Sequence, residues 1–306
     1  MKDSPYYRQA ELLLRILPLI MSEQDFALKG GTAINFFVRD MPRLSVDIDL
    51  TYCPLTERQT AFEDISEHLR YLAQAIIRVL PTSRIVFKTL HNSSFLKGAI
   101  VHWNDAVVKI EPNLVIRGTL FPVEMKSLSK KAEEVFEMAM QVKTLSTSEL
   151  YAGKICAALD RQHPRDLFDI RLMLNDERFD DGFRKAFIIY LISHPRPMSE
   201  LLQPRLKNIS DTEFHEFHQI MRTPITHAEL LATRDELVAL ILHSLTVQER
   251  QFLVSCMLET PEWELLGLGN LETLPAVRWK LMNIRKMPRK KRRQETHTLR
   301  KYLEVD

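Results

Sequence analysis

The spacing of apolar residues predicts helices and strands in the first half of the chain. Apolar side chains recur at helical spacing over residues 5–21, and a long helical stretch over 57–80 is stopped by Pro81. Shorter runs, alternating or continuously apolar, have the length of strands. The predicted strands are residues 25–28, 46–51, 84–90, 95–103, 106–111, 119–123 and 138–144, and residues 32–38 are predicted as a helix.

The pattern becomes almost wholly helical from Thr147 onward. We therefore predict an α+β domain over residues 1–145, followed by a helical domain over 146–306 that ends in a basic segment. The length of 306 residues fits two domains of ordinary size, each able to bury a core.

Composition restricts the class of protein. The apolar share of 45% and the charged share of 27% exclude a disordered or low-complexity chain. Three cysteines spread over the sequence form neither a disulfide framework nor a zinc motif, which favours reduced thiols. Arg15 and Pro18 interrupt the first apolar run, and no stretch approaches the ~18 apolar residues of a membrane span. We expect a cytoplasmic protein with no membrane partner.

Positive charge is concentrated near the C-terminus. Residues 278–301 contain eleven Lys and Arg against one acid, Glu295, so this segment carries +10 in a chain whose net charge is +2. The remaining residues therefore carry −8. Such a segment is typical of polyanion binding, although a solvated tail has the same composition.

Two of the eight glycines are adjacent, as Gly30-Gly31, and Thr32 follows them at the start of a predicted helix. Paired glycines serve a tight turn or the close approach of a ligand. Backbone N–H groups at the beginning of a helix bind phosphate oxygens, and the Thr32 hydroxyl adds a donor. A simple turn with an N-cap remains the alternative.

Fifteen residues after Thr32, Asp47 and Asp49 alternate with apolar residues in a predicted strand. Both carboxylates therefore project from one face, where hard oxygen ligands suit Mg²⁺. Glu111, at the end of the predicted strand 106–111, is the candidate third acid of a two-metal site. A solvated strand face, and for Glu111 a surface acid before Pro112, are the alternatives.

Four segments in order resemble the AbiEii/AbiGii toxin family of the DNA polymerase β-like nucleotidyltransferase superfamily. They are KGGTAIN (29–35), RLSVDIDL (43–50), KIEPNLVIRGT (109–119), and ELYAGK (149–154) with DR (160–161) and RDLFD (165–169). The resemblance implies a polymerase-β-like domain with a mixed sheet flanked by helices, then a mainly helical domain. It also implies the toxin of a type IV toxin–antitoxin or abortive-infection system, with a cognate antitoxin as a possible partner.

The resemblance also assigns roles to matching positions. The implied metal ligands are Asp47, Asp49 and Glu111, where the superfamily usually has Asp in the third place; the implied triphosphate-binding residues are Gly30, Gly31 and Thr32. Lys154 would reach the phosphates, and Asp166 is the acid of the last motif. Arg43 and Ser45, just before the acidic strand, either contact phosphate or cap the turn.

The last motif can also be interpreted from the spacing and charge of its residues, without the resemblance. Lys154 and Arg161 are seven residues apart and share a helix face, and Pro164 is suited to open the next helix. Asp166 and Asp169 on that helix would orient the two cations through charge-assisted hydrogen bonds. A purely structural ion-pair cluster between the helices is the alternative.

Together these features predict a Mg²⁺-dependent nucleotidyltransferase, with Mn²⁺ as a possible substitute. It would transfer a nucleoside monophosphate from an NTP to an RNA acceptor such as the 3′ end of tRNA. A small molecule or a protein are alternative acceptors. A non-catalytic module that keeps the fold and binds nucleic acid is the alternative from another class.

Overall fold

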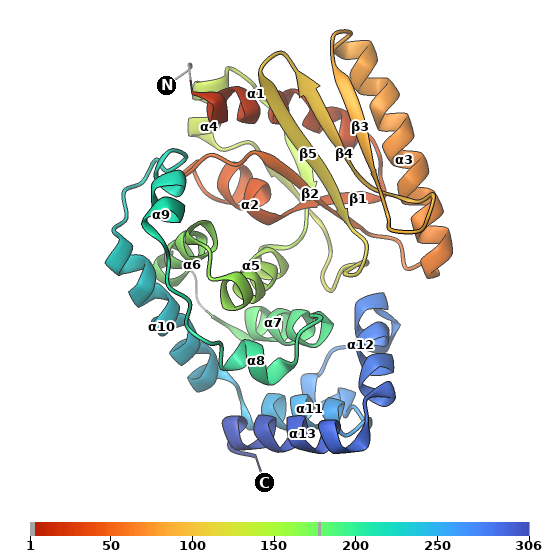
Figure 1. Cartoon of the computed structure of the whole chain (residues 1–306), viewed down its shortest axis with the longest axis vertical. Helices are drawn as coiled ribbons and strands as arrows, with labels where there is room; N and C mark the ends of the chain where they lie inside the picture. Colours follow the sequence, from red (N-terminus) through yellow and green to blue (C-terminus); the bar gives the residue numbers. More distant parts are fainter. Residues whose placement is uncertain (1–3, 177–178, 306) are drawn as a thin grey trace. The chain divides into compact units, whose positions relative to one another are not determined.

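A computed structural model describes residues 4–176 and 179–305 of the chain. Two compact units are distinguished within it (Figure 1). The first unit comprises Met1–Leu150 and His218–Pro224, and the second comprises Tyr151–Phe217 and Ile225–Asp306. The domain boundary expected between residues 145 and 146 remains a prediction.

The first unit contains a seven-stranded mixed sheet in the order β3-β4-β5-β2-β1-β7-β6. Two neighbouring pairs, β2 with β5 and β1 with β7, are parallel, and the other pairs are antiparallel. The predicted α+β class with a mixed sheet is therefore confirmed. The strands are β1 (Phe26–Lys29), β2 (Asp47–Tyr52), β3 (Arg84–Thr89), β4 (Leu96–Trp103), β5 (Ala106–Asn113), β6 (Glu124–Ser127) and β7 (Gln141–Thr144).

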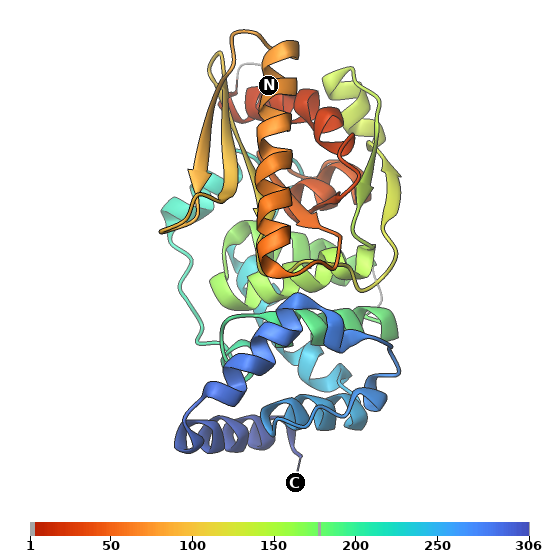
Figure 2. The same ribbon diagram turned by 90° about the vertical axis from the view of Figure 1, so that its right-hand side faces the viewer.

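Helices pack against this sheet. α1 contacts β5 and α3, while α3 contacts β4 and runs alongside the strands in Figures 1 and 2. α2 contacts β1 and β2 and continues directly into a π-helical turn, η1. The helices of this unit are α1 (Pro5–Met21), α2 (Gly30–Ala33), η1 (Ile34–Val38), α3 (Arg58–Val79) and α4 (Lys130–Phe136).

The core explains how β2 presents its acids. Ile48 and Leu50 are completely buried, as are Leu13 and Ile16 of α1. Because successive strand residues point to opposite faces, Asp47 and Asp49 project from the face opposite to Ile48 and Leu50.

One predicted strand, over residues 119–123, is wrong, since the strand β6 begins only at Glu124. The carboxylate of Glu149 accepts hydrogen bonds from the backbone N–H groups of Leu120 and Phe121, at 2.9 and 3.1 Å. Those donors are therefore taken by a side chain and are unavailable to a strand ladder. A second difference is that β5 continues past Glu111 through Pro112, which is in register with Leu50 of β2.

The second unit is helical, as predicted, and its first helix begins at the end of the first unit. Its helices are α5 (Thr147–Arg161), α6 (Pro164–Asp176), α7 (Asp181–Ser193), α8 (Met198–Leu202), α9 (Asp211–His218), α10 (His227–Ser244), α11 (Val247–Met257), α12 (Pro275–Lys286) and α13 (Arg289–Leu303).

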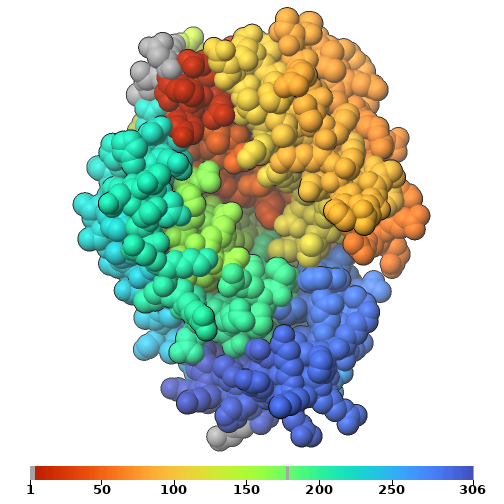
Figure 3. Space-filling model, in the orientation of Figure 1, coloured from red at the N-terminus to blue at the C-terminus, as the bar shows by residue number. Residues whose placement is uncertain are grey.

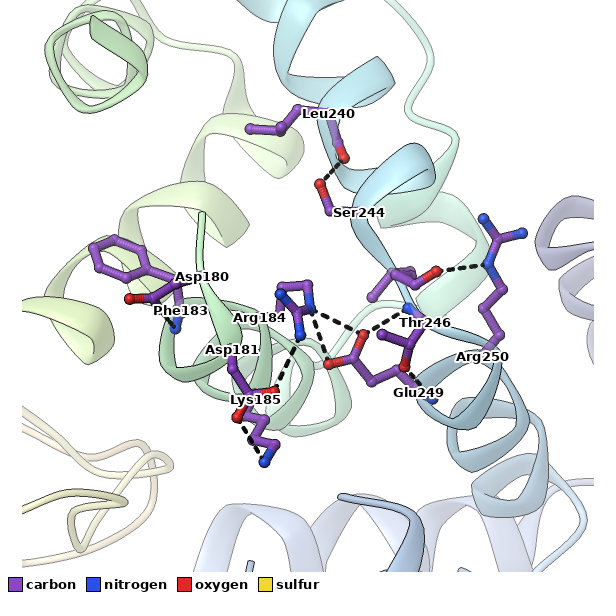
Figure 4. Close-up of polar contacts among 11 residues, drawn as sticks. Asp180, Asp181, Phe183, Arg184, Lys185, Leu240, Ser244, Thr246, Glu249 and Arg250 are labelled. Atoms are coloured by element: carbon purple, nitrogen blue, oxygen red, sulfur yellow. Dashed lines mark hydrogen bonds and ion pairs between the residues drawn. The ribbon is translucent and has the colours of Figure 1, made fainter. Parts of the chain in front are cut away.

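Ion pairs fasten these helices together. Figure 4 shows Arg184 of α7 between Asp181 and Glu249, with Nε to Oε1 of Glu249 at 3.1 Å. Glu249 also accepts from the backbone N–H of Thr246, closing a capping box at the start of α11. One nearly buried carboxylate thus both caps α11 and holds it against α7.

None of the helices in residues 4–176 and 179–305 combines the length and the apolar character needed to traverse a lipid bilayer.

Candidate active site

The diglycine turn and the acidic strand meet at Gly30. Gly30 has a φ of +71°, a conformation that other residues adopt at a cost. A Cβ on Gly30 would overlap Oδ2 of Asp49 and lie 3.0 Å from its Cγ. Glycine is therefore required here twice, for the backbone conformation and for the space that the Asp49 carboxylate occupies.

Gly31 is packed against a buried cation. A Cβ at Gly31 would lie 2.6 Å from Nη2 of Arg43 and 3.2 Å from Oγ of Ser45. The Arg43 residue is only 3% exposed, and its Nη1 donates to the carbonyl of Leu44 at 2.9 Å. The turn therefore has a positive guanidinium directly beside its backbone, which suits a triphosphate.

Thr32 fastens the turn to the start of β2. Its Oγ1 donates to the carbonyl of Asp47 at 2.6 Å and lies 2.9 Å from Oγ of Ser45. Thr32 is fully buried and Ser45 nearly so. The Thr32 hydroxyl is thus committed to the protein, and the predicted contacts of Thr32 and Ser45 with phosphate remain predictions.

Asp47 and Asp49 are both partly exposed on one face of β2. In the parallel pair with β5, Asp47 is in register with Lys109 and Asp49 with Glu111. Residues in register on neighbouring strands share a face. The backbone therefore places Glu111 beside Asp49, on a neighbouring strand as expected, and its role as a third acid remains a prediction.

The side chain of Glu111, however, is engaged elsewhere. Its Oε1 accepts from Nζ of Lys88, a residue of β3, at 2.9 Å. Among the residues that the structure describes, no three His, Cys, Asp or Glu side chains lie close enough together to hold a metal. The three acids thus share a sheet face without converging on one point in this conformation.

The donor chemistry of this face nevertheless fits a divalent cation. Carboxylate oxygens from Asp47, Asp49 and Glu111 are the ligands that Mg²⁺ and Mn²⁺ prefer. The Asp49 carboxylate occupies the space that a Cβ on Gly30 would fill, so it lies directly against the diglycine turn. These three residues are the candidates to hold such an ion.

Lys154 and Asp166 form a second cluster, within the helical unit. Nζ of Lys154 on α5 lies 3.0 Å from Asp166 Oδ1 and 2.9 Å from Asp169 Oδ2 on α6. Arg161 adds a bidentate contact to Asp166, with distances of 2.8 and 3.0 Å. α6 begins at Pro164, as predicted. The pairing of cations on α5 with acids on α6 fits both interpretations of the spacing, phosphate binding and a purely structural ion-pair cluster.

Burial and charge act in opposite directions on Asp166. Burial of this carboxyl group, which is 2% exposed, would raise its pKa. Lys154 and Arg161 outweigh that effect, so the pKa of Asp166 is held well below its ordinary value. Lys154 is itself 7% exposed, so the Lys154–Asp166 ion pair is buried.

The sequence analysis did not single out two residues beside Glu111, namely Lys88 and Gly98. An isolated glycine inside the predicted strand 95–103 was the available signal, because it marks a close backbone or side-chain approach. No signal in the sequence tied Lys88 to Glu111, since they are 23 residues apart.

Comparisons with known proteins identify the family and the fold of this chain. The profile of the family described as nucleotidyl transferase AbiEii toxin, type IV TA system, matches residues 11–283. A solved structure of MenT4, a nucleotidyltransferase toxin from Mycobacterium tuberculosis H37Rv, aligns with a TM-score of 0.58 at 13% identity. The alignment covers 97% of this chain and 95% of that one, and at this identity it shows a shared fold. A search of curated proteins found no match.

The match to the family extends over most of the chain, including both the acidic strand and the Lys154–Asp166 motif. It confirms the resemblance and the prediction of an enzyme. The chain belongs to the AbiEii nucleotidyltransferase toxin family of type IV toxin–antitoxin systems.

Proposed function

We propose that this toxin transfers a nucleoside monophosphate from an NTP to the 3′ end of a tRNA, with Mg²⁺ as the metal and Mn²⁺ as a substitute. The observation that carries the proposal is the placement of Asp49, on the same strand face as Asp47, directly against the Cβ-free Gly30. The acidic face of β2, which suits a metal ion, and the diglycine turn, which suits phosphate, are therefore in contact within the first unit.

Each residue of the turn has a distinct task in this proposal. Gly30 and Gly31 let the Asp49 carboxylate and the Arg43 guanidinium approach the turn closely, and their backbone N–H groups are proposed to bind the triphosphate. The Arg43 guanidinium beside Gly31 counters the charge of the phosphates. Thr32 and Ser45 hold the turn in register with β2, so that the acids and the phosphates stay aligned.

The cation would be held by Asp47 and Asp49, with Glu111 as the further ligand. Such an ion neutralises charge on the transferring phosphoryl group and makes an attacking hydroxyl more acidic. Lys154 is proposed to reach the nucleotide phosphates, with Asp166 as the carboxylate that orients its ammonium group. This assignment follows the family motif, whereas the buried ion pairs of Lys154 with Asp166 and Asp169 fit the structural alternative equally well.

The RNA acceptor is supported by the C-terminal helices. Arg250 and Arg292 tie α11 and α13 into the unit through the Leu303 carbonyl and the Glu259 carboxylate. α13 buries Thr296, Leu299 and Leu303 on its inner side. The basic segment is thus folded into the helices α12 and α13, and α13 has one buried apolar side. Figure 3 shows these C-terminal residues in blue.

One lysine of this segment has a structural task instead. Lys280 is 7% exposed, and its Nζ donates to the carbonyls of His194 and Arg196 at 2.7 and 2.5 Å. Burial lowers the pKa of Lys280 to about 8. Lys280 therefore anchors α12 to the end of α7.

Eight of the other ten basic side chains are exposed and suit the phosphate backbone of RNA, whereas Arg292, which pairs with Glu259, and Arg300 are half-buried. The exposed members are Arg278, Arg285, Lys286, Arg289, Lys290, Lys291, Arg293 and Lys301. We further propose a cytoplasmic location, where tRNA and NTP are available, and a cognate antitoxin as the partner that the family implies.

Labelling of purified protein tests the proposal. The full chain is incubated with each of the four α-³²P-labelled NTPs, total tRNA and Mg²⁺, and the product is resolved and its end mapped. We expect tRNA labelling that Asp47→Asn and Asp49→Asn abolish. Asp105→Asn, which changes an exposed acid in the turn between β4 and β5, is the matched control. Label on protein or on a small molecule would contradict the tRNA acceptor, and unaffected labelling in Asp49→Asn would contradict the site.

A further inference from the structure

Lys88 reaches the candidate metal ligand from two strands away. It lies on β3, the edge strand, and its partner Glu111 lies on β5, with β4 between them. The Nζ–Oε1 distance of 2.9 Å is that of a direct ion pair. The lysine side chain therefore crosses the face of β4 to make this contact.

Gly98 of β4 makes the crossing possible. Lys88 is in register with Gly98 in the β3–β4 ladder, next to an irregularity between Lys88 and Thr89. A Cβ at Gly98 would lie 2.6 Å from the carbonyl oxygen of Ile110 and 3.7 Å from Cγ of Glu111. The β4 position between the two charged residues thus carries no side chain that would separate them.

Glu111 has a second direction in which its carboxylate can turn. Its backbone is in register with Asp49 on β2, the neighbouring strand on the side away from β4. A ligand position shared with Asp49 lies on that side, whereas Lys88 approaches from the β4 side. One carboxylate thus lies between an ammonium group and the acidic face of β2.

We propose that the ammonium group of Lys88 competes with a divalent cation for the carboxylate of Glu111, the proposed third metal ligand. Glu111 then pairs either with Lys88 or with the cation. The proposal rests on the proposed function, because it takes Asp47 and Asp49 as the primary ligands. It assigns Lys88 as a positioning residue that acts through Glu111.

The exposure of the pair makes the exchange feasible. The side chains of Lys88 and Glu111 are 30% and 43% exposed. Ion pairs this open to water are weak and are readily replaced by a stronger partner. A divalent cation carries twice the charge of the ammonium group and is attracted to several carboxylates at once.

Isothermal titration calorimetry of the full chain with Mn²⁺ measures the affinity for the cation, and it tests the competition without a turnover assay. We expect Lys88→Gln to bind Mn²⁺ about two- to tenfold more tightly than the unmodified chain, because a competing cation is removed. Lys126→Gln is the matched control, since Lys126 pairs with Glu124 on β6 at 2.6 Å and with similar exposure. The control should leave the affinity unchanged.

A double-mutant cycle assigns the effect to Glu111. In a Glu111→Gln background, Lys88→Gln should no longer tighten Mn²⁺ binding, because the contested carboxylate is absent. Thermal unfolding of each variant verifies that the chain remains folded.

The possible results separate the two proposals. Mn²⁺ binding that depends on Asp49 but is unchanged or weakened in Lys88→Gln overturns the competition and leaves the metal site intact. If no variant shows Mn²⁺ binding that depends on Asp49, the metal site itself fails and the competition fails with it.

Discussion

Gly30 and the carboxylate of Asp49 occupy adjoining space that admits no further atom. A Cβ on Gly30 would overlap Asp49 Oδ2, and the backbone of Gly30 is already in a left-handed conformation with φ of +71°. The turn and the acidic strand are therefore positioned against each other by the absence of a side chain. This contact joins the two halves of the candidate active site.

Replacing Gly30 should damage both the fold and the activity. We expect Gly30→Ala to lower the free energy of unfolding by about 1–3 kcal/mol, because of the positive φ and the overlap with Asp49. The rate of tRNA labelling should fall by more than the fraction of folded protein does, because the Asp49 carboxylate must move. Urea unfolding and labelling with NTP measure the two effects. Gly269→Ala is the control, because a Cβ there has no atom within 4 Å; equal behaviour of both variants would contradict the argument.

Lys154 should matter for stability as well as for nucleotide binding. Lys154→Ala leaves Asp166 and Asp169 buried with less compensation, which is expected to cost roughly 3–5 kcal/mol. Lys185→Ala removes a more exposed lysine that pairs with Asp181 at 2.8 Å, and it should cost no more than about 1 kcal/mol. Chemical unfolding of the two variants in parallel provides the comparison. Similar losses would show that the Lys154 cluster is not a buried ion-pair network in solution.

Acid should destabilise the helical unit through Asp166. Its pKa is lower in the folded chain than the ordinary value of about 3.9 in an unfolded one. The unfolded state therefore binds the proton first as pH falls, so the stabilisation is present at neutral pH and is lost below about pH 4. Asp166→Asn should be less stable at pH 7 and should show a flatter loss of stability below pH 4. An unchanged slope in Asp166→Asn, measured by urea unfolding from pH 7 to pH 3, would contradict this assignment.

The basic surface of α13 should control the salt dependence of RNA binding. Changing Lys290, Lys291 and Arg293 together to Gln removes three exposed charges. We expect weaker tRNA binding, and a slope of log K against log salt that is smaller by about two to three. Filter binding over a series of salt concentrations measures this slope. The control is the double variant Lys130→Gln, Lys131→Gln, which changes two exposed lysines of α4. An equal change of slope in the α13 and α4 variants would show that RNA binding depends on overall charge and not on the surface of α13.

Expression in a bacterial host should arrest growth, because the chain belongs to a toxin family. Asp49→Asn should relieve the arrest, since the acid that contacts the turn is lost, whereas Asp105→Asn should remain toxic. Growth curves with immunoblots for equal protein levels measure the effect. Toxicity that persists in Asp49→Asn would separate the arrest from nucleotidyl transfer.

Local sequence patterns anticipated most of the elements correctly. The helix predicted over residues 5–21 is α1, and the strands predicted over 95–103 and 106–111 correspond to β4 and β5. These elements follow from the spacing of apolar residues, which depends only on neighbours in the chain. The strand predicted over 119–123 was wrong because Glu149, distant in sequence, takes up the backbone donors of Leu120 and Phe121.

The site was predictable to the level of strands but not of side chains. Alternation in β2 correctly placed Asp47 and Asp49 on one face, and the register with β5 places Glu111 next to Asp49. The pairing of Glu111 with Lys88 was not predictable, because it depends on the order of three strands and on the missing side chain at Gly98.

The sequence by itself determined the family motifs, the helical and strand periodicities and the concentration of basic charge, since each is a property of residues close together in the chain. Only the tertiary structure decided which partner a charged group takes when that partner is remote in the sequence. It buries Lys280 at the end of α7 and directs Glu111 toward Lys88. Such choices depend on burial and on distances between remote segments, because the strength of a charge–charge contact is set by its separation and its access to water.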